Sequence, residues 1–267
     1  MTNYICATCG VQHAETDAPP AHCPICEDER QYIGHAGQRW TTIQEMQRTH
    51  HNRIEEIALN LTGIGTVPAF AIGQRALLVR TPNGNVLWDC VSLLDDATVE
   101  AVRALGGISA IAVSHPPAVG SLVEYSHAFN NAPIYWHADN RDWVMRPDSA
   151  FVFWEGETHT IMDGLTLIRC GGHFAGSDVL HWAQGAEGRG ALLTGDTMQV
   201  AQDRRYVSFM YSYPNMIPLN KRAVERIVNA VEPFDFELIY GGWWDFHVVD
   251  AKSAVKRSAE RYIKAIS

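Results

Sequence analysis

Four cysteines near the start of the chain have the spacing of a metal site. They form two C-x-x-C pairs, Cys6 with Cys9 in "CATCG" and Cys23 with Cys26 in "CPIC". Each C-x-x-C turn directs both of its sulfur atoms to one side, so two such turns complete a tetrahedral shell for Zn or a single Fe. The loop between the pairs cannot bury a core of its own, and metal binding must supply most of its folding energy. The sequence therefore predicts a structural metal site.

Two histidines and one aspartate follow apolar, strand-like runs later in the chain. They are His115 in "AVSHPP", His173 in "RCGGHFAGSDVLHW" and Asp196 in "ALLTGDTMQV". Side chains at strand ends meet at the rim of a sandwich, where loops build functional sites. Two imidazoles and a carboxylate suit one Zn or non-haem Fe(II) with open positions for water, whose pKa the metal lowers. The pattern predicts a catalytic metal site formed by these three residues.

Each of these three residues also has a simpler interpretation. His115 could hydrogen-bond at the start of a helix, His173 could be packed in a glycine-rich loop, and Asp196 could cap a turn. A complete metal shell needs a fourth group, which could be water or one of three further histidines: His127, His137 and His247.

Hairpin signals come first along the main part of the chain, and alternating strands and helices follow them. Turns are expected at residues 73–74 and 83–84, and Asp95 and Asp96 precede an amphipathic helix that stops at a glycine pair. The later strands are expected at 108–114, 132–138, 151–161, 163–172, 178–184, 190–196 and 236–242, and the later helices at 122–131, 218–231 and 250–266, the last capped by Asp250. This order indicates a layered α/β body with mixed sheets.

The segment between the cysteines and this body has helix-like spacing around Ile54, Ile57 and Leu61, which indicates a linker that leads into a helix or an extended wrap. We therefore expect three parts: a four-cysteine knuckle at 1–36, a linker and helix at 37–66, and the main domain at 67–267.

The first part, "YICATCGVQHAETDAPPAHCPIC", resembles the rubredoxin-like knuckle of rubrerythrin-type proteins. The likeness includes the glycine after the second cysteine and the proline between the last two. The resemblance implies that this module could bind iron and transfer electrons. The favoured alternative is a zinc ribbon with a structural or docking role. His13 and His22 lie nearby as alternative ligands.

From Val67 to the C-terminus the chain resembles the metallo-β-lactamase superfamily. The matching pieces are a strand followed by Ser114 and His115, the "GGHFAGSDVLHW" segment, "LLTGDTM", and "VLWDCV" with Asp89. The resemblance implies a four-layer αβ/βα sandwich of two mixed sheets. It also implies that His115, His173 and Asp196 are catalytic metal ligands and that Asp89 braces the site from behind.

The chain departs from the family's T-H-x-H-x-D-H turn. On residues 114–120 the second histidine of that turn becomes Pro117, the aspartate becomes Val119 and the last histidine becomes Gly120. A further histidine that the family supplies near the C-terminus is replaced by glycine, and only His247 is near enough to substitute. The departures predict one metal ion at most, Zn or Fe.

Aromatic residues gather in the same half of the chain as the last two predicted ligands. Those expected to line an apolar substrate pocket are Phe174, Tyr211, Tyr213 and Trp243, with core packing as the alternative. The expected function is a metal-dependent hydrolase with a mononuclear site, acting on an ester, thioester or lactone. The alternatives are a non-catalytic ligand-binding member of the fold that has lost its metal centre, and a redox protein with iron in the knuckle.

The composition limits the partners. The 267 residues are 46% hydrophobic, but no run approaches the roughly 18 apolar residues of a membrane span. A formal net charge of -9 with scattered basic residues argues against nucleic acid. The start of the sequence lacks an export pattern, so we expect a cytoplasmic protein with a small-molecule substrate; the sequence indicates no oligomeric state. In a cytoplasmic protein, Cys90 and Cys170 are expected to be buried and to pack like small hydrophobic residues.

Overall fold

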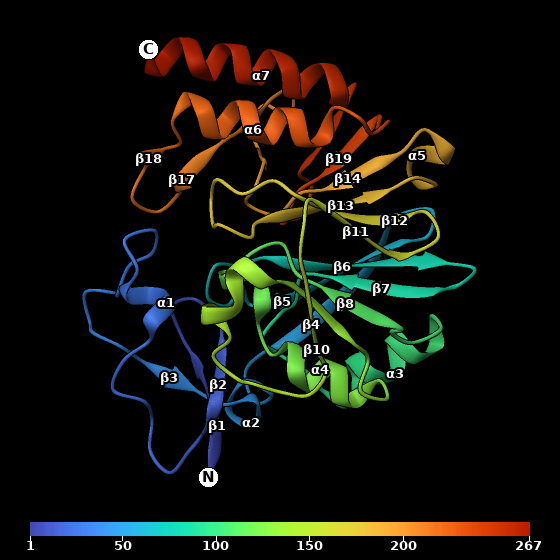
Figure 1. Cartoon of the computed structure of the whole chain (residues 1–267). Coiled ribbons are helices and arrows are strands. Elements are labelled where there is room, and N and C mark those ends of the chain that lie inside the picture. Colours follow the sequence, from blue (N-terminus) through green and yellow to red (C-terminus); the bar gives the residue numbers. More distant parts are fainter. The chain divides into compact units, whose positions relative to one another are not determined.

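The chain folds around two mixed β-sheets, one in each of two units, as the computed structural model of residues 1–267 shows (Figure 1). Unit 1 comprises residues 1–136 and 141–153, and unit 2 comprises residues 137–140 and 154–267. The mixed α/β class expected from the sequence is confirmed. None of the helices is both long enough and apolar enough to cross a bilayer.

The main sheet of unit 1 has seven strands. In sequence order they are β4 (His51–Ala58), β5 (Leu61–Val67), β6 (Arg75–Thr81), β7 (Gly84–Trp88), β8 (Ala110–Ala112), β9 (Ile134–His137) and β10 (Phe151–Trp154). Their spatial order is β10-β9-β8-β7-β6-β5-β4. The first four pair antiparallel, whereas β7, β8 and β9 run parallel and need crossover connections, which helices α3 (Asp96–Ala104) and α4 (Leu122–Ala128) provide.

Helix α3 begins and ends where the sequence predicts. The Asp95 carboxylate accepts a hydrogen bond from the Thr98 N–H (2.8 Å), which satisfies one of the free backbone donors of the first turn. Gly106 and Gly107 follow the helix with φ of +103° and +76°, a conformation that glycine adopts without strain. The chain is thereby turned back into β8, the strand that leads to His115.

The N-terminal part of unit 1 is a small module of short elements. They are β1 (Thr2–Cys6), β2 (Gln12–Thr16), α1 (Pro24–Glu27), β3 (Trp40–Thr41) and α2 (Ile43–Met46). The strands form a three-stranded sheet in the order β2-β1-β3, and the first two make an antiparallel hairpin. Cys6 ends β1 and Cys9 lies in the hairpin turn, whereas Cys23 directly precedes α1 and Cys26 lies in it.

The helix expected around Ile54, Ile57 and Leu61 is wrong. These residues lie in β4 and β5, an antiparallel pair in which Ile54 faces Ile64. Two glycines inside β5 weaken its strand propensity when the sequence is considered alone. Pairing on both sides, with β4 and with β6, decides the conformation instead.

Unit 2 contains a six-stranded sheet and two long helices. The strands are β11 (Thr158–Met162), β12 (Leu165–Arg169), β13 (Asp178–Trp182), β14 (Ala191–Leu193), β19 (Leu238–Tyr240) and β20 (His247–Val249), in that spatial order. The connections contain α5 (Gly185–Gly188), β15 (Gln199–Val200), β16 (Val207–Ser208), β17 (Met210–Ser212) and β18 (Ile217–Pro218). Only β14 and β19 pair in parallel, and helix α6 (Lys221–Val231) lies in their crossover.

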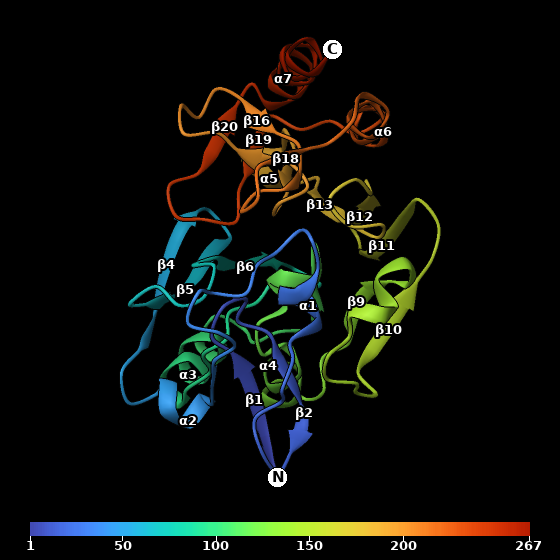
Figure 2. The same cartoon turned by 90° about the vertical axis from the view of Figure 1, so that its left-hand side faces the viewer.

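Helix α7 (Ala251–Ile266) packs beside α6, as Figures 1 and 2 show. Asp250 precedes α7 as expected, but it does not cap the helix. Its backbone is left-handed (φ +50°), its side chain makes no cap hydrogen bond, and the carboxylate pairs with Arg257 instead (3.0 Å). The predicted boundary is therefore right and the predicted capping role is wrong.

Candidate metal centres

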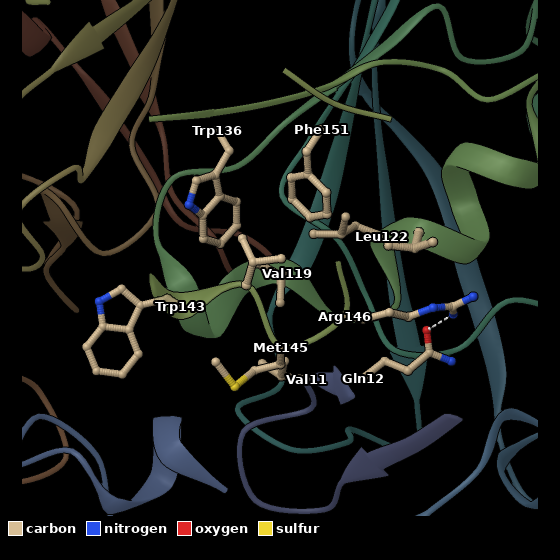
Figure 3. Close-up of a pocket in the computed structure, with 12 residues that line it drawn as sticks. Val11, Gln12, Val119, Leu122, Trp136, Trp143, Met145, Arg146 and Phe151 are labelled. Carbon is tan, nitrogen blue, oxygen red and sulfur yellow. Dashed lines mark hydrogen bonds between the residues drawn. The ribbon is translucent and has the colours of Figure 1, made fainter. Parts of the chain in front are cut away.

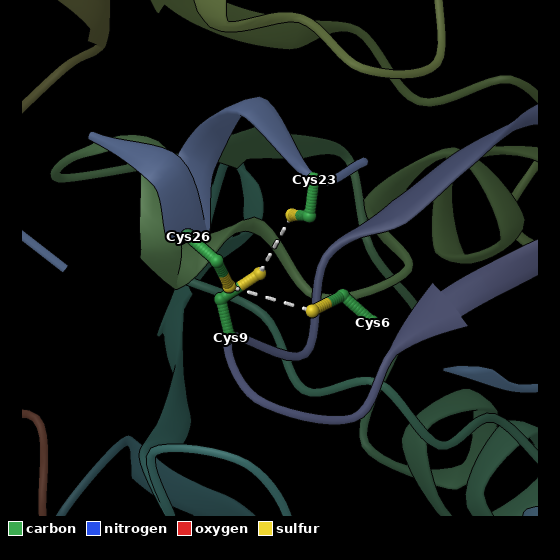
Figure 4. Close-up of side chains that lie close together, drawn as sticks. All are labelled: Cys6, Cys9, Cys23 and Cys26. Carbon is green, nitrogen blue, oxygen red and sulfur yellow. Dashed lines mark hydrogen bonds between the residues drawn. The ribbon is translucent and has the colours of Figure 1, made fainter. Parts of the chain in front are cut away.

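The four N-terminal cysteines converge on one point in unit 1 (Figure 4). Their sulfur atoms lie within 4.8 Å of one another, with 3.5 Å between the Sγ atoms of Cys6 and Cys26 and 3.7 Å between those of Cys9 and Cys23. A tetrahedron with metal–sulfur bonds of about 2.3 Å has edges of about 3.8 Å, so the spacing fits one ion. The cysteines are free, with no disulfide among them. The predicted four-cysteine cluster is confirmed.

Hydrogen bonds and burial shift the pKa values of the thiols in the cluster. The Gln38 amide donates to the Cys6 Sγ (3.2 Å), and the His13 Nε2 lies 3.6 Å from the Cys23 Sγ. Hydrogen bonds from neighbouring thiols, foremost Cys26, hold the pKa of Cys23 well below its usual range, whereas burial raises the pKa of Cys9. Metal binding must therefore displace protons from buried thiols, and its affinity falls as the pH falls.

The two histidines weighed as alternative ligands lie outside this cluster. His13 contacts a sulfur atom through Nε2 and packs edge-on against the Trp40 ring, with 4.8 Å between the ring centres. His22 is exposed and pairs with Glu27 (2.6 Å). Four sulfur atoms already complete the shell.

His115 in unit 1 stands directly before the short 3-10 helix η1 (Pro116–Val119) and is held by a chain of hydrogen bonds. The Ser114 N–H and hydroxyl both donate to the Asp89 Oδ1 (2.8 Å each), so the hydroxyl oxygen accepts from the His115 Nδ1–H (2.8 Å). This arrangement fixes the tautomer and leaves the Nε2 lone pair for a metal. Asp89, to which the resemblance gives a bracing role, is thus linked to His115 through Ser114; that it braces a metal site stays a prediction.

The turn after His115 carries no other ligand. Pro117 and Val119 are buried among apolar residues, and Gly120 has φ +48° and ψ −125°. A β-carbon on Gly120 would lie 2.4 Å from the Val91 carbonyl oxygen, so only glycine fits. In unit 1 this turn can therefore offer one imidazole to a metal.

His173 and Asp196 form the corresponding group in unit 2. The His173 Nδ1–H donates to the Met210 carbonyl oxygen (3.1 Å), so Nε2 is the unprotonated nitrogen of the neutral imidazole. Nε2 lies 3.9 Å from the Asp196 Oδ2, and both side chains are buried. Two atoms bound to one ion by bonds of about 2.1 Å are at most about 4.2 Å apart, so the pair fits a shared metal.

Unit 2 has a groove with a volume of about 510 Å³. Its first lining residue, Gln199, follows Asp196 closely in the chain. Its lining residues are Gln199, Val200, Ala201, Gln202, Ser208, Met210, Tyr213, Trp243 and Phe246. Of the four aromatic residues expected there, Tyr213 and Trp243 line it and two do not. Phe174 is buried edge-on against the His173 ring (5.0 Å), and Tyr211 is half-buried against the apolar core of unit 2.

The histidines considered for a fourth ligand have other positions. His247 is exposed on β20, opposite Tyr240. The His137 Nε2 donates to the Gly156 carbonyl oxygen (3.1 Å) and its Nδ1 accepts from the Asp139 N–H. His127 is largely exposed and pairs with Asp148 (2.9 Å). None of the three is part of a group of possible metal ligands.

The resemblance named Asp89, but the sequence did not indicate how the other hydrogen-bond partners of the two imidazoles would orient them. Ser114 directly precedes His115, but its bond to Asp89 joins residues far apart in the chain. The acceptor for His173 is the backbone oxygen of Met210, which carries no side-chain signal. A carbonyl acceptor can be recognised only from the fold.

We expect Cys90 and Cys170 to be unreactive in the native protein. Both are fully buried, and burial raises the pKa of each thiol, so neither forms the thiolate that attacks an alkylating reagent. Peptide mapping after iodoacetamide treatment should find these thiols modified only in protein unfolded with denaturant. Rapid labelling of Cys170 in folded protein would contradict this assignment.

The comparisons with known proteins identify one close relative and a fold. The chain is 50% identical over 269 residues to the uncharacterized protein YmaE of Bacillus subtilis strain 168, covering 100% of this chain and 98% of that protein. No family model matches the sequence.

Solved structures of metallo-β-lactamases have the same fold. VMB-1 matches with a TM-score of 0.62 and 14% identity over 81% of this chain and 99% of its own. DIM-1 metallo-β-lactamase matches with a TM-score of 0.60 and 13% identity over 81% and 99%. FIM-1 from Pseudomonas aeruginosa, solved in a mono-zinc form, matches with a TM-score of 0.56 and 14% identity over 79% and 95%. At such identities the likeness establishes the fold and leaves function to the site.

Proposed function

We propose that this chain, which belongs to one family with YmaE of Bacillus subtilis and has the metallo-β-lactamase fold, is a metal-dependent hydrolase. The observation that carries the proposal is the buried pair in unit 2. The ligand atoms of His173 and Asp196 are 3.9 Å apart, and the other nitrogen of the imidazole is engaged by a carbonyl oxygen. A buried imidazole and carboxylate arranged in this way suit a catalytic ion.

We assign His115 as the third ligand of one ion. The support is that its Nδ1 is engaged by Ser114, as the Nδ1 of His173 is by Met210, so that each imidazole offers the same atom. Three protein ligands with an open position are typical of catalytic zinc. A second ion is not proposed, because Pro117, Val119 and Gly120 supply no ligand atom in the turn. Zn is favoured and Fe remains the alternative.

The metal would lower the pKa of a water molecule and polarise a carbonyl group. The chain itself fixes the ligands. The Tyr213 hydroxyl accepts from the Gln199 N–H (3.3 Å) and donates to the Ser208 carbonyl oxygen (2.9 Å), which holds the loop after Asp196 in place. Burial raises the pKa of Tyr213 well above its usual range, so this hydroxyl keeps its proton.

The groove of unit 2 supports a proposal for the substrate class. Most of its lining side chains are apolar, including Val200, Met210, Trp243 and Phe246, with a few polar groups among them. Such a surface suits an apolar acyl group with a polar reacting centre. We therefore propose an ester, thioester or lactone with an apolar acyl part as substrate. The six free cysteines agree with a reducing, cytoplasmic location.

Substitution of His173 by alanine is the direct test. Because the variant loses a ligand, we expect total metal to fall from about two equivalents to about one. Ester hydrolysis should fall by more than the roughly 10–100-fold that follows loss of a residue supporting a ligand. The matched control is His51→Ala, an exposed strand histidine, which should keep both metal and activity. Elemental analysis and p-nitrophenyl acyl ester assays supply the measurements, and unchanged hydrolysis in His173→Ala would overturn the assignment.

A second candidate function is favoured by the ligand-poor turn in unit 1. A member of the fold that binds a small ligand without catalysis needs only the groove, and the buried Pro117 and Val119 would not harm it. Metal analysis separates the two functions. If wild-type protein holds metal only in the cysteine cluster, this second function is correct and the hydrolase is not. A protein that is colourless as purified would also exclude iron electron transfer in the knuckle.

A further inference from the structure

We propose that the four-cysteine knuckle positions the His115 turn, defined as residues 114–120. The knuckle here means β1, β2 and α1 with their four cysteines. The knuckle is then more than a separate structural module. Metal in the knuckle keeps the turn in the conformation that orients the His115 imidazole. The inference concerns only unit 1 and does not depend on the hydrolytic activity.

Backbone hydrogen bonds join the knuckle directly to the turn and its support. The Gln12 N–H donates to the carbonyl oxygen of Gly120 (3.0 Å), the residue that ends the turn. The Ser92 hydroxyl donates to the Gly10 carbonyl oxygen (2.6 Å). Gly10 follows Cys9 in the chain, so the metal ligand and the contact belong to the same tight loop.

A side-chain network extends the same contact to helix α4, and Figure 3 shows its bond between Arg146 and Gln12. Arg146 Nη1 donates to both the Gln12 Oε1 and the Glu124 Oε1, the latter at 2.6 Å, and the Gln12 Nε2 donates to the same carboxylate oxygen (3.3 Å). Gln12 is buried, and Glu124 lies in the first turn of α4, which follows the His115 turn. The charge-assisted bonds therefore fix the position of α4 relative to β2.

Packing between the knuckle and the turn leaves little free space. Val11 and Val119 are both buried and line the same cavity with Leu122 and Met145, and its volume is about 20 Å³, enough for about one water molecule (Figure 3). A close-packed contact transmits a displacement of one side to the other. A shift of β2 would therefore move Val119 and Gly120, at the far end of the turn that begins with His115.

The knuckle depends on its metal for a fixed conformation. Its strands β1 and β2 have five residues each, and an isolated hairpin of this size is marginal in water. The four buried sulfur atoms lie at the end of this hairpin, so an ion there fixes the loop that carries Gly10 and leads into Gln12. Without the ion the contacts to the turn would lose their support.

Hydrogen exchange measured by mass spectrometry tests the coupling. In wild type the Ala118 amide donates to the His115 carbonyl oxygen (3.0 Å) and the Ser121 amide to that of Val91 (3.2 Å), so the peptide 114–124 reports on the turn. In Cys23→Ser, which lacks the knuckle metal, we expect exchange of this peptide to be at least about tenfold faster. The β6–β7 peptide 75–88 of the same unit should exchange as in wild type.

A second pair of variants leaves the cysteines intact. Gln12→Ala removes the bonds to Arg146 and Glu124 and should accelerate exchange of peptide 114–124 by about threefold or more while the knuckle keeps its metal. The matched control is Gln47→Ala, an exposed glutamine bonded to the Leu94 carbonyl oxygen, which should leave exchange unchanged. Wild-type exchange of the turn in metal-free Cys23→Ser overturns the proposal. If Cys23→Ser unfolds throughout, wild-type exchange in Gln12→Ala overturns it.

Discussion

Gly120→Ala is expected to lower the free energy of unfolding by about 2 to 5 kcal/mol. At φ +48° and ψ −125° an L-residue is strained, which accounts for about 1 to 2 kcal/mol. The added β-carbon would also lie 2.4 Å from the Val91 carbonyl oxygen and 3.0 Å from the Ser92 nitrogen, and relieving such overlap costs about 1 to 3 kcal/mol. The atoms in the way are backbone, so no side-chain rotation removes the clash.

Urea unfolding of Gly120→Ala beside Gly156→Ala separates these two costs. Gly156 also has a positive φ, +89°, but a β-carbon there would meet nothing within 4 Å. Its substitution should therefore cost only the conformational part, about 1 to 2 kcal/mol. Equal losses in the two variants would show that the close approach to Val91 is not present in the folded protein.

The turn also shows why one part of the site could be predicted and another could not. Pro117 and Val119 stand where the related turn has ligands, and the sequence alone reveals this because the comparison is local. The left-handed backbone of Gly120 and its contact with Val91 depend on how β7 and its loop approach, and no local pattern contains that information. That this turn gives one imidazole to a metal stays a prediction.

Local patterns predicted the elements well where caps and spacing decide the conformation. The cysteine pairs are short-range signals, and the Asp95 cap and the glycine stop delimit α3. Pairing partners decided the rest. Residues 51–67 form β4 and β5 because β6 completes their ladder, which overrides the helix-like spacing of Ile54 and Ile57.

The contacts that give the knuckle its place in unit 1 were invisible in the sequence. Gln12 meets Glu124 and Arg146 across separations of 112 and 134 residues, and each looks like an ordinary surface residue. The groove was predicted only in part for the same reason. Gln199 of β15 and Phe246, just before β20, line it, whereas Tyr211 of the aromatic segment packs against the core.

Substitution of a cysteine in the knuckle is expected to cause the largest loss of metal affinity. Cys9→Ser should remove one metal equivalent, because a serine hydroxyl does not ionise at neutral pH and three thiolates leave the tetrahedral shell open. Structural zinc shells contribute apparent binding free energies of about 10–16 kcal/mol. The packing of a hairpin of this size cannot supply a comparable stabilisation. We therefore expect residues 1–36 to become sensitive to limited proteolysis in this variant.

The matched control for Cys9→Ser is Cys170→Ser, since both remove a fully buried thiol. Cys170 lies in unit 2, where its sulfur contacts the Ile168 carbonyl oxygen and no other cysteine. That variant should lose stability from a buried hydroxyl yet keep its metal content and its resistance to proteolysis at residues 1–36. If Cys9→Ser kept the wild-type metal content, the four sulfur atoms would not be the ligands of one ion, and the spacing of the cluster would need another explanation.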